Sequence, residues 1–225
     1  MAHEPAEADT AAAEFLTDGP RDSRTVLVLA HGAGAGMDTP FMAHFARELG
    51  AGGVRVVRFE FPYMQRRRSD GKRRPPDRMP VLTAAFTDVV AKLRAELRPE
   101  ALFIGGKSMG GRVASMIADE VQATGAVCLG YPFHPAGRPD SLRTEHLERL
   151  RTPTLIVQGT RDPLGSRDEV SRLRLSPAIE IFWCEDGDHD LRPRRASGRT
   201  ADDNLEAAAA RIRGFVAAPT RGGRP

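Results

Sequence analysis

A serine between glycines is the first feature of this sequence that could carry out chemistry. Residues 105–111 read Gly-Gly-Lys-Ser-Met-Gly-Gly, so Ser108 has a glycine two positions before it and another two positions after it. An apolar run, 101–104, precedes this segment, and a stretch with apolar residues at helical spacing, 113–121, follows it. Between a strand and a helix, Gly-x-Ser-x-Gly is typical of a sharp turn that exposes a serine hydroxyl at the helix N-terminus. The pattern predicts that Ser108 attacks a carbonyl carbon.

A serine nucleophile needs a base and an acid, and both follow later in the sequence. The apolar run 154–158 leads to Asp162, and the run 179–184 leads to His189. Because the carboxyl ends of parallel strands meet at one edge of a sheet, we expect Ser108, Asp162 and His189 to converge there. His189 is then the base, and Asp162 is the acid that orients it.

Other roles for these two loops stay open. Asp162 could cap a helix that begins near Ser166, and His189 could be a solvated loop residue. Asp186 and Asp188 are rival acids, although side chains next to His189 in sequence would more easily face solvent.

A glycine-rich turn, 31–36 (HGAGAG), follows the first apolar run. Glycines allow the backbone of such a turn to approach a substrate closely. We expect the backbone N–H groups of Ala33 and Met109 to bind the oxyanion that forms during the reaction, with Gly34 as the second choice for Ala33. His31 is expected to brace the turn rather than to take part in the chemistry.

Two other interpretations of the glycine-rich segments are weaker. The turn 31–36 suggests a dinucleotide site, and Glu60 closes the next strand as such a site requires, but the third glycine of the fingerprint is missing. The segment 105–108 (GGKS) resembles the end of a phosphate-binding loop, yet Ala101 stands where that loop needs its first glycine. The sequence has no metal-ligand spacing either, so we expect neither a metal nor an organic cofactor.

Short apolar runs alternate with helical stretches, which predicts an α/β fold with a doubly wound, mostly parallel sheet of about six to seven strands. The predicted strands cover 25–30, 54–59, 101–105, 126–129, 154–158 and 179–184. The predicted helices contain the apolar stripes 41–49, 82–97, 113–121 and 205–216. The strands 54–59 and 179–184 are less apolar than the others, as expected at the edges of the sheet.

The composition is that of a globular protein with one generous domain. The chain has 225 residues, a net charge of +3 and 40% apolar residues, and no apolar run is long enough to span a bilayer. We expect a single domain at 13–217 between disordered tails at 1–12 and 218–225. Cys128 and Cys184 lie within apolar runs, so we expect them to be reduced and buried in a cytoplasmic protein.

Taken together, these residues resemble the α/β-hydrolase superfamily. Within it, the sequence is similar to the small group of dienelactone-hydrolase-like proteins, testis-expressed 30 proteins and the third subunit of the nonspecific-lethal complex. The resemblance is carried by 31–42, 59–64, 105–115, 130–147, 158–165 and 186–191. It implies a minimal hydrolase core with little or no lid, in which Ser108, Asp162 and His189 are the catalytic residues.

We therefore expect a serine hydrolase that cleaves a small ester-like molecule. The sequence does not distinguish an ester from a thioester, a lactone or a small amide. Residues 131–150 are the only candidate for a cap. The residues expected to line the substrate pocket are His31, Phe61, Tyr63, Met64, Phe133 and His134.

A basic, proline-rich segment, 65–80, has seven Arg and Lys residues and two Asp residues, and we expect it to be a loop. Its arginines at 66–68 could select an anionic substrate. Alternatively, the chain could be a weakly catalytic or non-catalytic binding module that holds an acidic partner through this loop. The loop has no aromatic residue for base stacking, which disfavours a nucleic-acid partner.

Overall fold

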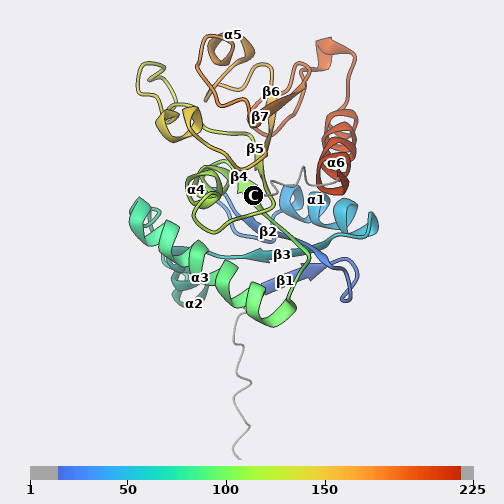
Figure 1. The fold of residues 1–225 in the computed structure, drawn as a ribbon. Coiled ribbons are helices and arrows are strands. Elements are labelled where there is room, and N and C mark those ends of the chain that lie inside the picture. The colour runs from blue at the N-terminus through green and yellow to red at the C-terminus, as the bar shows by residue number, and fades with distance from the viewer. Residues whose placement is uncertain (1–14, 219–225) are drawn as a thin grey trace, which may run out of the picture.

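Seven strands lie side by side in one sheet, in the order β1-β3-β2-β4-β5-β6-β7 (Figure 1). This computed structural model describes residues 15–218, so the tails predicted at 1–12 and 218–225 lie, apart from residue 218, outside the described residues. The strands are β1 (Phe15–Asp18), β2 (Thr25–Ala30), β3 (Arg55–Phe59), β4 (Ala101–Lys107), β5 (Gly125–Leu129), β6 (Thr154–Gly159) and β7 (Ile179–Cys184). All neighbouring strands are parallel except β1 and β3. The prediction of an α/β fold with a mostly parallel sheet is confirmed.

The central strands are apolar because helices cover both faces of the sheet. Every residue of β5 and β6 is buried, and so is every residue of β2 after Thr25. The predicted edge strand 179–184 is the edge strand β7. The strand predicted at 54–59 is not at the edge, because β1 pairs with it and Arg58 donates a hydrogen bond to Asp18 at 2.8 Å. The sequence analysis missed β1, which at four residues is too short to show a strand periodicity.

Two pairs of helices cover the sheet. On one face, α1 (Pro40–Ala51) contacts α6 (Ala201–Ala217), and on the other face α3 (Met79–Leu97) contacts α4 (Met109–Ile117). Each of them buries one apolar stripe, so the four predicted helices are confirmed. The short helices are α2 (Pro62–Asp70), α5 (Arg167–Val170), η1 (Glu145–Glu148) and η2 (Arg195–Ser197).

The basic segment 65–80 is not a loop throughout. Its first six residues belong to α2, which begins with Pro62 and is followed by Gly71 in the left-handed conformation that often terminates a helix. Tyr63 and Met64 anchor this helix because both side chains are buried. Several arginines of the segment 65–80 pair with carboxylates. These ion pairs are Arg66–Asp77, Arg68–Glu60, Arg68–Asp38 and Arg74–Asp70. The segment is therefore less available to an acidic partner than its composition indicates.

Both cysteines, Cys128 and Cys184, are unpaired and buried, as predicted. Burial raises the pKa of each thiol to about 12. Among residues 15–218, no helix is both long enough and apolar enough to cross a bilayer.

The core between α3 and the sheet is built on Phe86, which is fully buried and lies 4.8 Å from the Phe59 ring, measured between ring centroids. Replacing Phe86 by Ala should lower the free energy of unfolding by about 3–5 kcal/mol, because the truncation leaves a cavity. Denaturant unfolding measures this loss. Val81→Ala is the control on the same helix: Val81 is 45% exposed, so its truncation should cost less than about 0.5 kcal/mol. Equal losses in the two variants would contradict this description of the core.

Candidate active site

Ser108 lies at a sharp turn between the end of β4 and the first residue of α4. Its backbone angles, φ 50° and ψ −112°, are uncommon for a residue with a side chain and store about 1–3 kcal/mol of strain. Two backbone hydrogen bonds hold the turn: Ser108 N–H donates to the Leu129 carbonyl at 2.9 Å, and Arg112 N–H donates to the Ser108 carbonyl at 3.0 Å.

The glycines around Ser108 are required by close packing against β2. A Cβ atom on Gly106 would lie 2.2 Å from the Ala30 carbonyl oxygen, and one on Gly110 would lie 2.4 Å from the same atom. Contacts this short between a Cβ and a backbone oxygen do not occur in proteins, so neither position admits a side chain without a backbone shift. The glycine spacing that the sequence analysis singled out thus has a direct steric cause.

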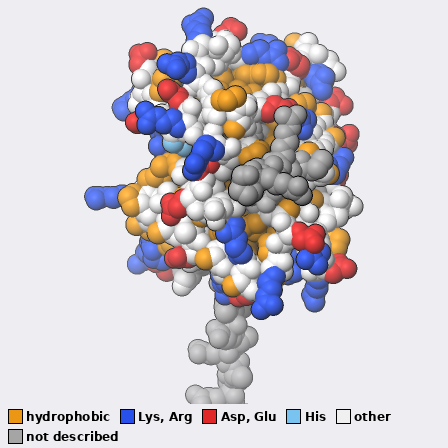
Figure 2. Space-filling model, viewed as in Figure 1, with side chains coloured by type: hydrophobic (Ala, Val, Ile, Leu, Met, Phe, Trp, Pro, Cys, Tyr) orange, Lys and Arg blue, Asp and Glu red, His pale blue; other side chains and the backbone are white. Residues whose placement is uncertain are grey.

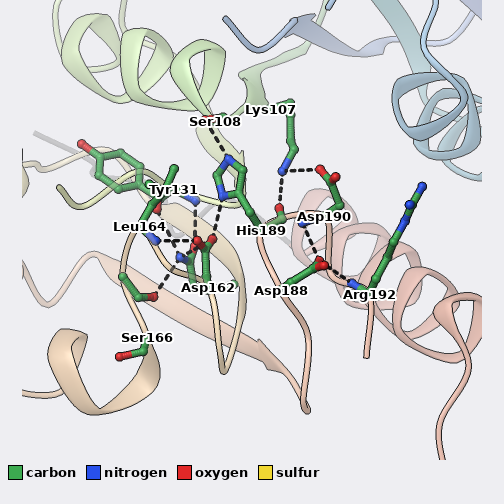
Figure 3. Close-up of polar contacts among 12 residues, drawn as sticks. Lys107, Ser108, Tyr131, Asp162, Leu164, Ser166, Asp188, His189, Asp190 and Arg192 are labelled. Carbon is green, nitrogen blue, oxygen red and sulfur yellow. Dashed lines mark hydrogen bonds and ion pairs between the residues drawn. The ribbon is translucent and has the colours of Figure 1, made fainter. Parts of the chain in front are cut away.

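Three side chains form a hydrogen-bonded chain at the carboxyl ends of β4, β6 and β7 (Figure 3). His189 Nε2 lies 2.9 Å from Ser108 Oγ, and His189 Nδ1 lies 2.8 Å from Asp162 Oδ2. Since a carboxylate only accepts hydrogen bonds, Nδ1 carries the proton, and the Ser108 hydroxyl donates to Nε2. The imidazole is thereby placed to take the hydroxyl proton.

Asp162 is completely buried, and its carboxylate is held by further donors. Gln158 Nε2 donates to Oδ2 at 2.9 Å, and Leu164 N–H donates to Oδ1 at 2.8 Å. Asp162 is not a helix cap, because Ser166 caps α5. The sequence analysis missed Gln158, although its place near the end of β6, four residues before Asp162, is the signal that could have indicated its role.

The rival acids have other partners. Asp186 pairs with Arg161 and Arg194, and Asp188 Oδ1 accepts the backbone N–H groups of Asp190 and Arg192. Asp162 is the one acid among residues 15–218 that is hydrogen-bonded to the His189 ring.

Two buried side chains brace the glycine-rich turn. His31 Nδ1–H donates to the Gly32 carbonyl at 2.7 Å, and its Nε2 accepts the Phe61 N–H at 3.1 Å, which is the bracing role expected of His31. Burial lowers the pKa of His31, in keeping with the neutral ring that these bonds require. Tyr63 Oη–H donates to the Ala33 carbonyl at 2.9 Å.

Glu60, the acid that a dinucleotide site would use for a ribose, is already engaged. Its carboxylate accepts two hydrogen bonds from Arg68, at 2.6 and 2.7 Å, and one from the Met37 N–H at 3.2 Å. Glu60 therefore has a structural role next to the glycine-rich turn. It is not available to bind a ribose, which argues against a dinucleotide site.

A cavity of about 480 Å³ opens beside Ser108. Its walls come from the glycine-rich turn, from the start of α1 and from the His189 loop. Besides Ser108 and His189, its lining includes Phe41, Met42, Lys107 and Arg192.

None of the six side chains predicted for the pocket lines this cavity, which corrects that prediction. The reason is burial: all six are at most 4% exposed, because Phe61, Tyr63, Met64 and Phe133 pack in the core on the α3–α4 side of the sheet. His31 is bonded to the backbone of the glycine-rich turn, and His134 Nε2 lies 3.6 Å from Glu169 Oε1. Residues 131–150 line no part of the cavity either, so they do not cap it.

Lys107 is the second residue that the sequence analysis missed. It is the residue x before the serine of Gly-x-Ser-x-Gly, and its ammonium group donates to the His189 carbonyl and pairs with Asp190 at 3.2 Å (Figure 3). The ammonium also lies 4.9 Å from the centre of the Phe41 ring, a cation–π contact. Burial lowers the pKa of Lys107, and the Asp190 carboxylate opposes that effect. Lys107 thus joins the turn at Ser108 to the loop that carries His189.

The model of the alpha/beta hydrolase domain family matches residues 23–217 of this chain. The chain belongs to the α/β-hydrolase family. This agrees with the resemblance seen in the sequence and with the geometry around Ser108.

Solved structures share the fold of this α/β hydrolase. A dienelactone hydrolase from Anabaena variabilis is 18% identical, with a TM-score of 0.70 and 92% of each chain covered. A serine hydrolase without a lid from Xanthomonas campestris is 19% identical, with a TM-score of 0.68, and the match covers 91% of this chain and 90% of that one. Est1E from Butyrivibrio proteoclasticus, with ferulic acid bound, is 14% identical, with a TM-score of 0.67, and the match covers 89% of this chain and 92% of that one.

The steric role of Gly110 can be tested by stability alone. Gly110→Ala should lower the free energy of unfolding of this α/β hydrolase by about 1–3 kcal/mol, the usual cost of overpacking. Gly214→Ala in α6 is the matched control: nothing stands closer than 4.0 Å to its added Cβ, so the higher helix propensity of Ala should raise stability by about 0.5–1 kcal/mol. Changes of the same sign in the two variants, measured by denaturant unfolding, would contradict the packing argument.

Proposed function

We propose that this α/β hydrolase cleaves a small ester through an acyl-enzyme on Ser108, with His189 as general base and Asp162 as the acid that orients it. The observation that carries the proposal is the unbroken chain of hydrogen bonds from Ser108 through His189 to Asp162, at 2.9 and 2.8 Å. An isolated serine is a poor nucleophile, and an adjacent oriented imidazole is the usual means of activating it.

In the first half of the reaction, Ser108 Oγ bonds to the carbonyl carbon while its proton passes to His189 Nε2. The carbonyl π electrons move to the oxygen, which becomes an oxyanion. Asp162 stabilises the positive charge that develops on the imidazole and holds the proton on Nδ1.

The oxyanion needs donors that are in place before it forms. Met109 is the first residue of α4, where a backbone N–H has no partner within the helix. Ala33 lies in the wall of the cavity, on a turn that His31 and Tyr63 hold. We assign the oxyanion to the N–H groups of Ala33 and Met109, each contributing about 3 kcal/mol of transition-state stabilisation.

In the second half, the tetrahedral intermediate collapses, the bond to the alcohol oxygen breaks, and His189 gives its proton to the leaving group. A water molecule then attacks the carbonyl carbon of the acyl-enzyme while His189 removes a proton from it. The bond between Ser108 Oγ and the acyl carbon breaks, His189 returns the proton to Ser108 Oγ, and the acid product is released. No cofactor is needed in these steps.

The cavity supports a small substrate. At about 480 Å³ it has the size of a site for a small organic molecule, and Phe41 and Met42 give it an apolar wall. The structure of Est1E with ferulic acid is in keeping with a small organic ester as the substrate class. The cationic residues at the cavity are Lys107 and Arg192, so selection of an anionic substrate would fall to these two rather than to the arginines at 66–68, which do not line it.

An activated serine reacts with fluorophosphonates, so a fluorophosphonate probe tests the proposal. We expect wild-type protein to be labelled, and Ser108→Ala and His189→Ala to lose labelling by a factor of 10³ or more, because both the nucleophile and its base are required. Ser171→Ala, which removes an exposed hydroxyl far along the chain in the loop after α5, is the control and should react like wild type. A folded wild-type protein that does not react would favour the binding module.

The contacts of Lys107 generate a separate prediction. Lys107→Met removes the bond to the His189 carbonyl and the ion pair with Asp190, and should slow fluorophosphonate labelling about tenfold or more, because displacement of a catalytic group by a fraction of an ångström has effects of this size. Lys107→Arg keeps the charge and should recover part of the rate. Lys72→Met, on the exposed segment after α2, should have no effect. Wild-type reactivity in Lys107→Met would exclude a positioning role.

A further inference from the structure

A second cavity, of about 350 Å³, lies between α4 and the segment 142–149, which contains η1. It shares no residue with the cavity at Ser108. Its volume falls in the range of sites for small molecules. Figure 2 shows basic side chains and a histidine gathered at the left edge of the molecule, at the level where Figure 1 draws α4 and the yellow turn before β6.

Three arginines line this second cavity: Arg112, Arg143 and Arg149. Within residues 15–218 none of the three side chains has an ion pair or a hydrogen bond to a carboxylate, in contrast to Arg66 and Arg68 of α2. The Nε atom of Arg112 is buried without any hydrogen-bond partner. Buried donors are nearly always satisfied in folded proteins, so an unsatisfied one on a residue that lines a cavity points to a missing acceptor.

The positive charges lie close enough to affect one another. Burial and the nearby charge of Arg112 lower the pKa of Arg143. The same two causes lower the pKa of His146, whose Nε2 atom lies 2.9 Å from Ser115 Oγ, to about 4. Glu145 also lines the cavity but does not come within ion-pair distance of the arginines. An anion between Arg112 and Arg143 would relieve this repulsion.

Two of the residues that line the cavity are apolar and exposed. Met116 and Leu142 are 37% and 52% exposed, and among residues 15–218 Val81 is the one other large hydrophobic side chain that is exposed to this degree. Exposed apolar side chains that gather beside a cavity are typical of a surface that binds a partner molecule. Here they adjoin the arginines: Met116 lies one helical turn after Arg112 on α4, and Leu142 directly precedes Arg143. The cavity lining is therefore both cationic and apolar.

We propose that this cavity binds a small organic anion whose phosphate or carboxylate group is held by Arg112 and Arg143 and whose apolar part covers Met116 and Leu142. A guanidinium group presents two parallel N–H donors, which suits both kinds of oxyanion. Arg149 adds charge at the exposed side. The site is independent of the proposed hydrolase reaction, because none of its residues belongs to the chain of Ser108, His189 and Asp162.

Isothermal titration of the full chain with phenyl phosphate, benzoate, inorganic phosphate and benzyl alcohol tests the proposal. We expect phenyl phosphate or benzoate to bind wild type, and the stronger of the two identifies the preferred oxyanion. Arg112→Gln and Arg143→Gln should each weaken that binding at least tenfold, whereas Arg47→Gln, an exposed arginine on α1 across the sheet, should leave it unchanged. Leu142→Ser should weaken phenyl phosphate but not inorganic phosphate.

Three results would overturn the proposal. If benzyl alcohol bound as tightly as phenyl phosphate, the negative charge of the ligand would not contribute to binding. Binding that is unchanged in Arg112→Gln but lost in Arg192→Gln would place the ligand at Ser108 instead. If neither phenyl phosphate nor benzoate bound to wild type, the cavity would not be an anion-binding site. Leu142 is half exposed, so Leu142→Ser should fold normally. This variant therefore still tests the site if an arginine variant fails to fold.

A spectroscopic readout follows binding at the site itself. A bound anion offsets the charge of Arg112 and should raise the pKa of His146 from about 4, as read from the NMR shifts of its ring protons during a pH titration. An unchanged titration of His146 at saturating phenyl phosphate would contradict binding beside Arg112.

Discussion

The candidate site depends on how closely the turn after β4 approaches the end of β2. The Ala30 carbonyl oxygen stands where a Cβ of Gly106 or Gly110 would have to lie, so the two glycines allow the turn and the first turn of α4 to pack directly on the β2 backbone. This contact brings the strained Ser108 next to the glycine-rich turn that follows β2. The proposed nucleophile, Ser108, and one proposed oxyanion donor, Ala33, are therefore positioned by the same steric constraint.

The parallel sheet positions the other two residues of the candidate site, Asp162 and His189. Because β4, β6 and β7 all end at one edge, the loops that follow them carry Ser108, Asp162 and His189 to the same place without long connections. Loop backbones are mobile unless other contacts hold them. Here Gln158 and the Leu164 N–H hold the Asp162 carboxylate, and Lys107 holds the His189 carbonyl. Two side chains on strands, Gln158 of β6 and Lys107 of β4, thus help to hold the residues of the candidate site that lie on loops.

Much of this was predictable from the sequence because it depends on local patterns. Apolar runs, helical stripes and the glycine spacing around Ser108 reflect burial and sterics within a few residues, and they predicted six of the seven strands and the three side chains that the structure joins by hydrogen bonds. The pocket was not predictable, because whether Tyr63 or Phe133 faces a cavity or the core depends on the packing of distant elements. The same holds for Lys107 and for the arginines around α4, whose partners, or lack of them, are properties of the folded chain.

The central claim is that an acyl group is transferred to Ser108, and mass spectrometry of the trapped intermediate tests it most directly. The protein is mixed with p-nitrophenyl acetate, quenched in acid within the first turnover, digested and sequenced by fragmentation. The account predicts one acetyl group on Ser108 in wild type and none at this position in His189→Ala. Acetylation confined to the neighbouring Lys107, or equal acetylation of Ser108 with and without His189, would show chemical modification rather than catalysis and would contradict the account.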